Sequence, residues 1–459
     1  MTLTRENNSK FFLINRSDID GRFDAEYYNP GLLKRIKLIK EAKSIKLSTK
    51  IKTLQTGFNS EQNSEGKGVK FARTQNVRPL KPDLEGAAYT NDSLVRIPKK
   101  GSILFTRIGV NVGDVAYNDF GDFAISDNVI SAEFEDKTFA EYCCIFLNTE
   151  IGKSFIEREK RDTARAIISY QNIRNIYVPD IDRSTQKEVI RKINSASDLK
   201  KQKEAEASEL LNNIDRYFLD ELGLTLPKHG SDLSERLFIS NFSELTNSRF
   251  DPISIRNYKN ILSQRPKYPL LTFKELFIKN PQYGANEEAI DGDAEKDVRY
   301  IRITDIDEWG NLRNDTWKTA ANVHPSYLLN ENDILIARTG ATVGKAFIYK
   351  EHNRKAIFAG YMIRFFLDQK KANADFVFHY LNSGFYKYWV STIQRPSAQP
   401  NINSEEYKSL PIPLPPLEKQ NEISAKIILI RDQANKMFFE AESILENAKR
   451  EVEQMILSK

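Results

Sequence analysis

An arginine followed two residues later by a glycine occurs twice in this 459-residue chain, each time after an apolar run that predicts a strand. The first copy is Arg107 with Gly109, and the second is Arg338 with Gly340. Glycine lets a backbone approach a ligand closely, and a strand-end arginine places a long cationic side chain beside it. Arg and Lys side chains can fork onto guanine, and Asn and Gln onto adenine, so this chemistry would suit base recognition in DNA.

Two further polar clusters recur in the same order. Arg73-Thr74-Gln75-Asn76 corresponds to Arg302-Ile303-Thr304-Asp305, and a polar loop follows later in each half, at 161–172 and 395–401. Each cluster alone is more often a satisfied turn than a base reader, but their joint recurrence favours recognition. The predicted DNA-binding residues are Arg73, Gln75, Asn76, Arg107, Asn111 and Arg165 in the first half, and Arg302, Thr304, Arg338, Thr342, Lys345, Arg395 and Gln399 in the second.

These clusters belong to a duplication of the chain. Residues 101–113 reappear as 332–344, Leu147-Asn148 as Leu381-Asn382, and Arg22-Phe23-Asp24 as Arg249-Phe250-Asp251. The offset stays between 227 and 234 residues. Solenoid repeats are only about 20–50 residues long, so the pattern predicts a duplicated domain. Two copies of one binding surface predict a target with two parts.

Each copy ends at a proline step that leads into a long polar segment without proline, at 183–222 and 417–457. Both segments carry the 4-3 spacing of a coiled-coil seam. The seam residues are Val189, Ile193, Ala196, Lys200, Lys203, Ala207, Leu210, Ile214 and Tyr217 in the first, and Ile423, Ile427, Ile430, Ala434, Met437, Ala441, Ile444, Ala448 and Met455 in the second. The two lysines predict looser or wetter packing in the middle.

A helix of about 40 residues spans roughly 60 Å, so its apolar stripe needs a partner, and the nearest candidate is the other copy. The predicted fold class is therefore α+β. Two duplicated mixed α/β domains are separated by two long helices that form an antiparallel, pseudo-two-fold symmetric coiled coil. The alternative is that each helix packs on its own domain.

Within the domains, short β-branched and aromatic runs predict strands. They are Val69–Phe71, Ile103–Phe105, Val129–Phe134, Tyr300–Ile303, Ile334–Ile336 and Tyr361–Phe366. Segments 138–157 and 373–392 each predict one amphipathic helix, and the polar stretch 280–297 predicts a mobile loop.

Composition is that of a globular protein, with 40% hydrophobic and 29% charged residues. The net charge of +5 permits a nucleic-acid partner without demanding one. No apolar stretch approaches the ~18–20 residues of a membrane span, and the N-terminus lacks the pattern of a secretory signal. The two cysteines, Cys143 and Cys144, are adjacent. These features together predict a cytoplasmic protein.

Motifs for catalysis are weak. The segment from Gly340 to Lys345 is one residue short of a phosphate loop, and Ala346 stands where a Ser or Thr should bind magnesium. Asp180, Asp198 and Lys200 formally fit a metal-dependent nuclease pattern, but the latter two fall inside a predicted helix and have no repeat. The four histidines are scattered, so no metal site is predicted.

Taken together, the chain resembles the specificity subunits of type I restriction–modification systems over essentially its whole length. The resemblance rests on the alternation of two domains with two helical regions, the two Arg-x-Gly segments, the loop 395–401, and the step from Pro411–Pro416 into Leu417-Glu418-Lys419-Gln420. The first copy departs from this pattern, because 180–186 keeps only Gln186 of the last motif and Ser102 stands where the second copy has Asp333.

The resemblance implies a DNA-binding subunit without catalysis of its own. Target-recognition domains at 1–182 and 225–416 would each read half of a split double-stranded DNA site. Helices at 183–224 and 417–459 would space the halves and dock two methyltransferase (modification) subunits. Restriction and translocase subunits would complete a phage-defence system that methylates and cleaves DNA. S-adenosylmethionine, ATP and magnesium would be bound by those partners, and no cofactor by this chain.

Because the copies differ at candidate contacts, as with Asp114 against Lys345, the half-sites should differ in sequence. Three alternatives stay open at this point: a metal-dependent nuclease, a two-domain adaptor that binds proteins, and a specificity subunit of a related modification-only defence complex.

Overall fold

The computed structural model describes residues 12–16, 19, 25–41, 43–109, 111–160, 166–227, 239, 251–307, 310, 312–313, 317–351, 354–394 and 399–458. The fold consists of two compact units, which are 1–204 with 438–459, and 205–437. Arg22-Phe23-Asp24 and Arg249-Phe250 lie outside the described residues. Among the residues that are described, none of the helices is both long enough and apolar enough to cross a membrane.

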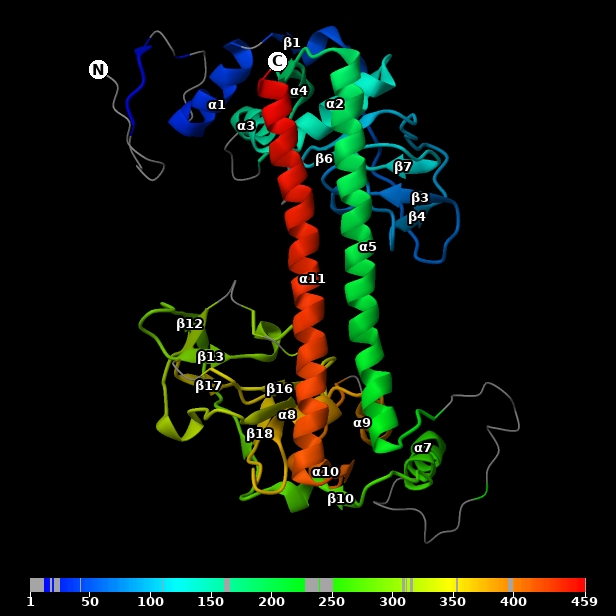
Figure 1. The fold of residues 1–459 in the computed structure, drawn as a ribbon, viewed down its shortest axis with the longest axis vertical. Coiled ribbons are helices and arrows are strands. Elements are labelled where there is room, and N and C mark those ends of the chain that lie inside the picture. Colours follow the sequence, from blue (N-terminus) through cyan, green and yellow to red (C-terminus); the bar gives the residue numbers. More distant parts are fainter. Residues whose placement is uncertain are drawn as a thin grey trace. The chain divides into compact units, whose positions relative to one another are not determined.

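The first unit is built on a four-stranded antiparallel sheet with the order β2 (Ile51–Thr56), β8 (Val129–Phe134), β5 (Ile103–Thr106), β6 (Val115–Tyr117). A three-stranded sheet has the order β4 (Ala88–Thr90), β3 (Val69–Ala72), β7 (Phe123–Ile125), and β1 (Ser44–Lys46) pairs with β9 (Tyr177–Pro179). The shorter helices are α1 (Pro30–Glu41), α2 (Lys137–Leu147), α3 (Glu150–Glu159) and α4 (Tyr170–Arg174). The 3-10 turns are η2 (Ala25–Tyr28), η3 (Leu47–Thr49) and η4 (Thr74–Asn76). Helix α2 contacts the larger sheet (Figure 1).

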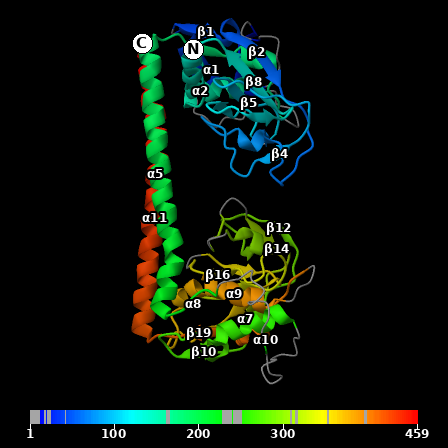
Figure 2. The same ribbon diagram turned by 90° about the vertical axis from the view of Figure 1, so that its right-hand side faces the viewer.

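The second unit repeats this arrangement. Its four-stranded sheet has the order β11 (Gln282–Tyr283), β18 (Met362–Phe365), β15 (Ile334–Ala337), β16 (Ala346–Ile348). The pairs are β12 (Ala289–Asp291) with β14 (Lys318–Ala320), β13 (Arg299–Ile301) with β17 (Ala356–Phe358), and β10 (Leu270–Thr272) with β19 (Pro411–Pro413). The shorter helices are α7 (Pro252–Leu262), α8 (Ala374–Tyr380), α9 (Gly384–Ile393) and α10 (Ser404–Lys408), with 3-10 turns η7 (Phe273–Leu276), η8 (Ile303–Asp305) and η9 (Pro325–Tyr327). Helix α9 lies beside α7 (Figure 2).

The duplication therefore extends to strand order and register. Leu104 of β5 lies opposite Ser131 of β8, and Leu335 of β15 lies opposite Arg364 of β18. The six predicted strand segments correspond to β3, β5, β8, β13, β15 and β18, with ends that agree to within two residues.

The predicted helices at 138–157 and 373–392 are each two helices. A hydroxyl side chain starts the second helix of each pair, because Thr149 accepts from the Gly152 amide and Ser383 from the Tyr386 amide. Such an N-cap oxygen accepts a hydrogen bond from an amide in the first turn of the new helix, which has no carbonyl partner within that helix. The prediction of a loop at 280–297 was also wrong in part, since that stretch contains β11 and β12.

The prediction of two long helices is confirmed by α5 (Arg183–Leu222) and α11 (Leu417–Leu457). In the first unit they lie side by side and antiparallel (Figure 1). The seam lysines are ion-paired: Lys200 contacts Glu442, and the Lys203 ammonium lies 2.7 Å from Glu440. Glutamates on the facing helix therefore compensate the charges that predicted a looser middle.

Both helices also enter domain cores, so packing on the partner helix and packing on a domain occur together. In the first unit, Val189 and Ile193 of α5 share a buried cluster with Val452 and Ile456 of α11. These last two extend the predicted seam beside Met455, which packs half-buried against the same cluster, and Glu451 pairs with Lys192. In the second unit, the ends of the helices join another core cluster through Phe218, Leu219, Ile423 and Ile427.

The glutamine at the start of each long helix binds the backbone that leads into it. Gln420 is fully buried, and its amide donates to the carbonyls of Pro415 (2.8 Å) and Lys371 (3.0 Å) while accepting from the Asn373 amide. Gln186 donates to Ile181 (3.0 Å) in the first copy. This bond explains why the glutamine is the part of the Pro-Leu-x-x-Gln motif that both copies keep.

Candidate nucleic-acid interface

In the first unit, the ends of two strands meet at one turn. The Ser126 amide donates to the carbonyl of Ala72, the last residue of β3, at 3.0 Å. The Arg107 amide, just after β5, donates to the Asn128 carbonyl at 2.9 Å. Arg73 follows Ala72 directly, so the turn at 126–128 joins the backbones of the two predicted contact arginines.

The second unit has the same arrangement. The Ala359 amide donates to the carbonyl of Ile301, the last residue of β13, at 3.0 Å. The Arg338 amide donates to the Tyr361 carbonyl at 2.9 Å. The turn at 359–361 therefore lies between Arg302 and Arg338, and the Tyr361 side chain on it is exposed.

The late polar loop of each copy lies against the same strand end. The Ile168 amide donates to the Arg107 carbonyl at 3.0 Å, and the Ile402 amide to the Arg338 carbonyl at 2.9 Å. Three motifs that are far apart in the sequence therefore meet at one edge in both units. We define this edge, the residues after β3 and β5 or after β13 and β15 with the adjoining turn and late loop, as the strand-exit surface.

The Arg338 side chain is held by an aromatic ring. Its guanidinium carbon lies 4.8 Å from the centre of the Tyr283 ring, and its Nε is buried without a hydrogen-bond partner among the described residues. The Tyr283 hydroxyl donates to the Ser404 hydroxyl at 3.2 Å, which fixes the ring. A cation–π contact of this kind is worth about 0.5–2 kcal/mol, so it orients the arginine before any ligand arrives.

Two of the predicted contact residues already have structural roles. Asn76 is buried, accepts from the Arg73 amide and donates to the Asp83 carbonyl, both at 2.9 Å. The Arg302 guanidinium donates to the buried Asp305 carboxylate at 2.6 and 3.1 Å, and this pairing raises the pKa of Arg302. DNA contact by either side chain stays a prediction. For the buried Asn76 it would require these bonds to break, whereas the Arg302 guanidinium has three further N–H donors besides the two that Asp305 accepts.

The other predicted residues differ in accessibility. Arg73, Gln75, Thr304, Thr342 and Gln399 are exposed, Arg107, Asn111, Arg338 and Lys345 are half-buried, and Arg165 and Arg395 lie outside the described residues. The Lys345 ammonium donates to the Ile306 carbonyl at 2.6 Å, and strand β16 follows it directly, where a phosphate loop would lead into a helix.

The copies differ in charge at this surface. Asp114 precedes β6 in the first unit at the place that Lys345 takes before β16 in the second. Burial raises the pKa of Asp114, and the nearby Lys153 and Arg78 oppose that rise. An acidic and a basic residue at the same loop position would favour different groups on a ligand.

Sequence reasoning missed a further repeat at the strand-exit surface. Gln55-Thr56-Gly57-Phe58-Asn59 recurs as Gln282-Tyr283-Gly284-Ala285-Asn286. An added Cβ would lie 1.7 Å from the Ile125 carbonyl oxygen at the first glycine, and 2.3 Å from that of Ala359 at the second. Only glycine fits against the turn. The repeated Gln-x-Gly-x-Asn pattern would have identified both the glycines and Tyr283.

The nuclease pattern does not form a site. Asp180 pairs with Lys43 before α5 begins, whereas Lys200 lies within the helix and contacts Glu442. Asp198 and Lys200 lie about 22–26 Å along α5 from its first residue, Arg183, at 1.5 Å per residue, and Asp180 precedes that residue. Among the described residues no group of three or more His, Cys, Asp or Glu side chains could hold a metal ion.

The chain is similar in sequence and in fold to known proteins. A model of the type I restriction modification DNA specificity domain matches residues 286–429. The chain is 23% identical over 374 residues, 79% of each protein, to the specificity subunit of the type I restriction enzyme MjaVIII from Methanocaldococcus jannaschii. One solved structure comes from work on complex assembly and conformational transition of the type I R-M system. Its alignment covers 90% of this chain and 96% of the chain in that structure. Its TM-score is 0.52 at 12% identity, which shows likeness of fold.

Proposed function

We propose that the chain is a type I restriction–modification specificity subunit and that each of its two copies reads one half of a split, asymmetric double-stranded DNA site. One observation carries the proposal: both units assemble the same strand-exit surface from three separate motifs, but with different side chains. The subunit would supply recognition, and partner subunits would supply the reactions together with S-adenosylmethionine, ATP and magnesium. Cys143 and Cys144 are buried free thiols, which agrees with a reducing cytoplasm.

Replacing Arg338 with alanine should weaken specific DNA binding by about 1–3 kcal/mol and relax the base preference at one position of one half-site. Arg107→Ala should have the corresponding effect on the other half-site. Titration of the subunit–methyltransferase complex with duplexes altered at single base pairs measures both effects.

The matched control is Arg265→Ala, which removes the same charge from an exposed arginine whose guanidinium, among the described residues, bonds only to backbone carbonyls at 263 and 264. That variant should keep its base preferences. Affinity that changes equally for all sequences in the Arg338 variant would assign the residue to phosphate, and unchanged affinity would remove it from the surface. Binding that ignores salt would favour a protein-binding adaptor, because phosphate contacts release counterions.

We further propose that α11 docks the methyltransferase subunits. Phe439 projects from this helix with 75% of its surface exposed, and Ile428 and Leu429 are exposed on the same helix. A large aromatic side chain in contact with water is the kind of residue that anchors protein interfaces. In the assembled complex, such a side chain would be covered by a partner.

Phe439→Asp should therefore weaken binding to the cognate methyltransferase subunit by about 30-fold or more, the effect of losing a hot-spot residue of at least ~2 kcal/mol. Analytical ultracentrifugation of the two purified proteins measures this. Lys436→Asp, a change at an exposed position on the same helix, should leave the affinity within a few-fold. Equal affinity for both variants would exclude Phe439 from the interface.

A further inference from the structure

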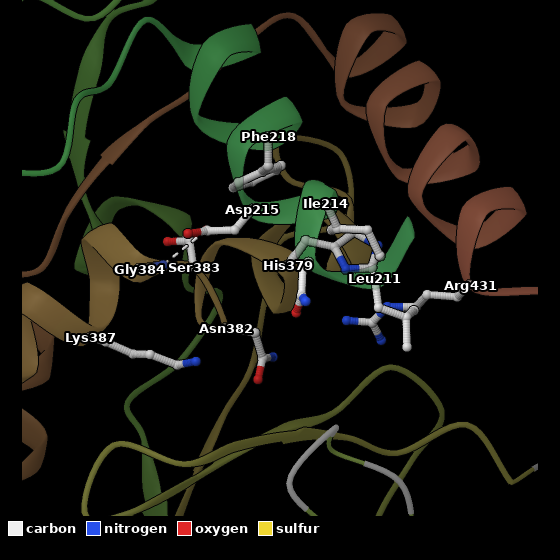
Figure 3. Close-up of a pocket in the computed structure, with 11 residues that line it drawn as sticks. Leu211, Ile214, Asp215, Phe218, His379, Asn382, Ser383, Gly384, Lys387 and Arg431 are labelled. Carbon is white, nitrogen blue, oxygen red and sulfur yellow. Dashed lines mark hydrogen bonds between the residues drawn. The ribbon is translucent and has the colours of Figure 1, made fainter. Parts of the chain in front are cut away.

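A pocket opens in the second unit between the end of α5, the step from α8 to α9, and α11 (Figure 3). Its volume is about 230 Å³. Its lining residues are Leu211, Asn212, Ile214, Asp215, Phe218, His379, Asn382, Ser383, Gly384, Lys387 and Arg431. Pockets for drug-sized ligands have volumes of about 300–1,000 Å³, so this one suits a smaller group.

His379 lines the pocket with both ring nitrogens unsatisfied. Only 6% of its surface is exposed, and neither Nδ1 nor Nε2 has a hydrogen-bond partner among the described residues. Burial, with the charges of Arg431 and Lys350, lowers the pKa of His379 to about 3, so the ring is neutral at pH 7. Buried polar atoms in proteins are nearly always hydrogen-bonded, so two unsatisfied nitrogens at a pocket leave room for a group from outside the chain, a water or a ligand, to bond them.

Cationic groups face the same space. Figure 3 shows the Lys387 and Arg431 side chains extending toward the pocket from opposite sides, with the Asn382 amide between them. Arg431 is half-buried, and no hydrogen bond or ion pair joins its guanidinium to another residue in the part of the chain that the structure describes. The centre of the Phe378 ring lies 5.7 Å from its guanidinium carbon. Burial lowers the pKa of Arg431, and the nearby carboxylates of Asp307 and Asp375 oppose that fall.

One acidic group lines the pocket, but its carboxylate is already engaged. Asp215 accepts a hydrogen bond of 2.9 Å from the Gly384 amide at the start of α9. The partial positive charge of that helix end further offsets the carboxylate. With His379 neutral, Arg431 and Lys387 give the lining two positive charges against one negative charge.

We propose that this pocket binds a phosphate group. The guanidinium of Arg431 can form paired hydrogen bonds with phosphate oxygens, Lys387 adds a second positive charge, and His379 and Asn382 each offer a nitrogen donor. The group would come from free inorganic phosphate or from the backbone of bound DNA, and only the DNA source rests on the proposed function.

The first copy provides an internal comparison. At the offset of 234 residues that relates Leu147-Asn148 to Leu381-Asn382, Ile145 takes the place of His379 and Ser197 that of Arg431. In the first unit these two residues line a different space of about 10 Å³, together with Leu80, Tyr117 and Ile193 among others. The phosphate site is therefore a property of the second copy alone.

Titration of the full-length protein with phosphate at constant ionic strength tests the proposal. NMR of the histidine ring signals reports the binding. The His379 signals, assigned with His379→Gln, should shift to saturation. Arg431→Ser, which copies the first domain, should weaken the apparent affinity by about tenfold or more. Lys387→Gln, at an exposed position, gives a second variant if the first does not fold. Lys426→Gln, on an exposed part of α11, should bind phosphate normally.

The source is then identified by adding duplex DNA to the phosphate-bound protein. Movement of the His379 signals to new, still shifted positions as DNA displaces the phosphate would indicate a backbone phosphate, and retention of the free-phosphate positions would indicate a free anion. The proposal is overturned if millimolar phosphate leaves the His379 signals unchanged, or if the Arg431 and Lys387 variants respond as the unaltered protein does. Neither outcome depends on whether the chain recognises a DNA sequence.

Discussion

Replacing Asp333 with serine should lower the free energy of unfolding of the second unit by about 3–5 kcal/mol. Asp333 is only 7% exposed and forms an ion pair with Arg364, which is 2% exposed. The guanidinium also donates to the Leu328 carbonyl at 2.8 Å and lies over the Phe366 ring. Without the carboxylate, a buried positive charge would have no counter-ion, and this accounts for the size of the effect.

The first copy shows how the fold does without this pair. Ser102 and Ser131 occupy the equivalent positions, and both are buried. The double variant Asp333→Ser with Arg364→Met removes both charges and keeps most of the side-chain volume, so it should be more stable than Asp333→Ser alone. Additive losses from the two substitutions would contradict a coupled ion pair.

Tryptophan fluorescence during urea unfolding measures these changes in the free energy of unfolding of the second unit. All three tryptophans, Trp309, Trp317 and Trp389, belong to residues 205–437. The half-buried Lys318 is not a suitable control because it pairs with Asp291. Thr304→Ser, at an exposed site in the same unit, provides the reference and should change the midpoint very little.

Insertion of four residues into both α5 and α11 should lengthen the spacer of the DNA target by about two base pairs. Four residues add about 6 Å of helix, close to one turn, which keeps the seam nearly in register. The insertions belong at one level, beside the contact between Lys203 and Glu440. Affinity for the original site should fall toward non-specific binding, at least about 10³-fold.

Mapping of methylated sites by the assembled complex measures the new spacer. The control is the same four residues added after Ser458, beyond the end of α11, where they should leave the spacer unchanged. A spacer of the original length in the double insertion would show that the paired helices do not set the distance between the half-sites.

The long helices could be predicted closely because their determinants are local. The preceding proline steps marked where α5 and α11 begin, and the spacing of apolar residues marked how far each helix extends. The split at Thr149 was missed because a threonine within an apolar helical pattern does not reveal whether it caps a new helix. Likewise β11 is only two residues long and is held by β18, about 80 residues later, so a polar stretch gave no indication of it.

The candidate site was predictable only in its recurrence. Repetition identified Arg107 and Arg338, and the structure brings the late loops against both. Repetition could not distinguish residues that contact bases from residues with a structural role. An asparagine that accepts from the backbone amide of Arg73, as Asn76 does, looks the same in sequence as one that contacts adenine. The stacking of Arg338 on Tyr283 joins residues 55 apart and depends on how the strands pair.

The most direct test of the central claim is to select duplexes from a random library with the assembled subunit–methyltransferase complex and to sequence those that are retained. Two short blocks of defined bases should emerge, different from each other and separated by an undefined spacer of constant length. The Arg338→Ala complex should lose preference in only one block. A single continuous block, or retention without any base preference, would contradict the account.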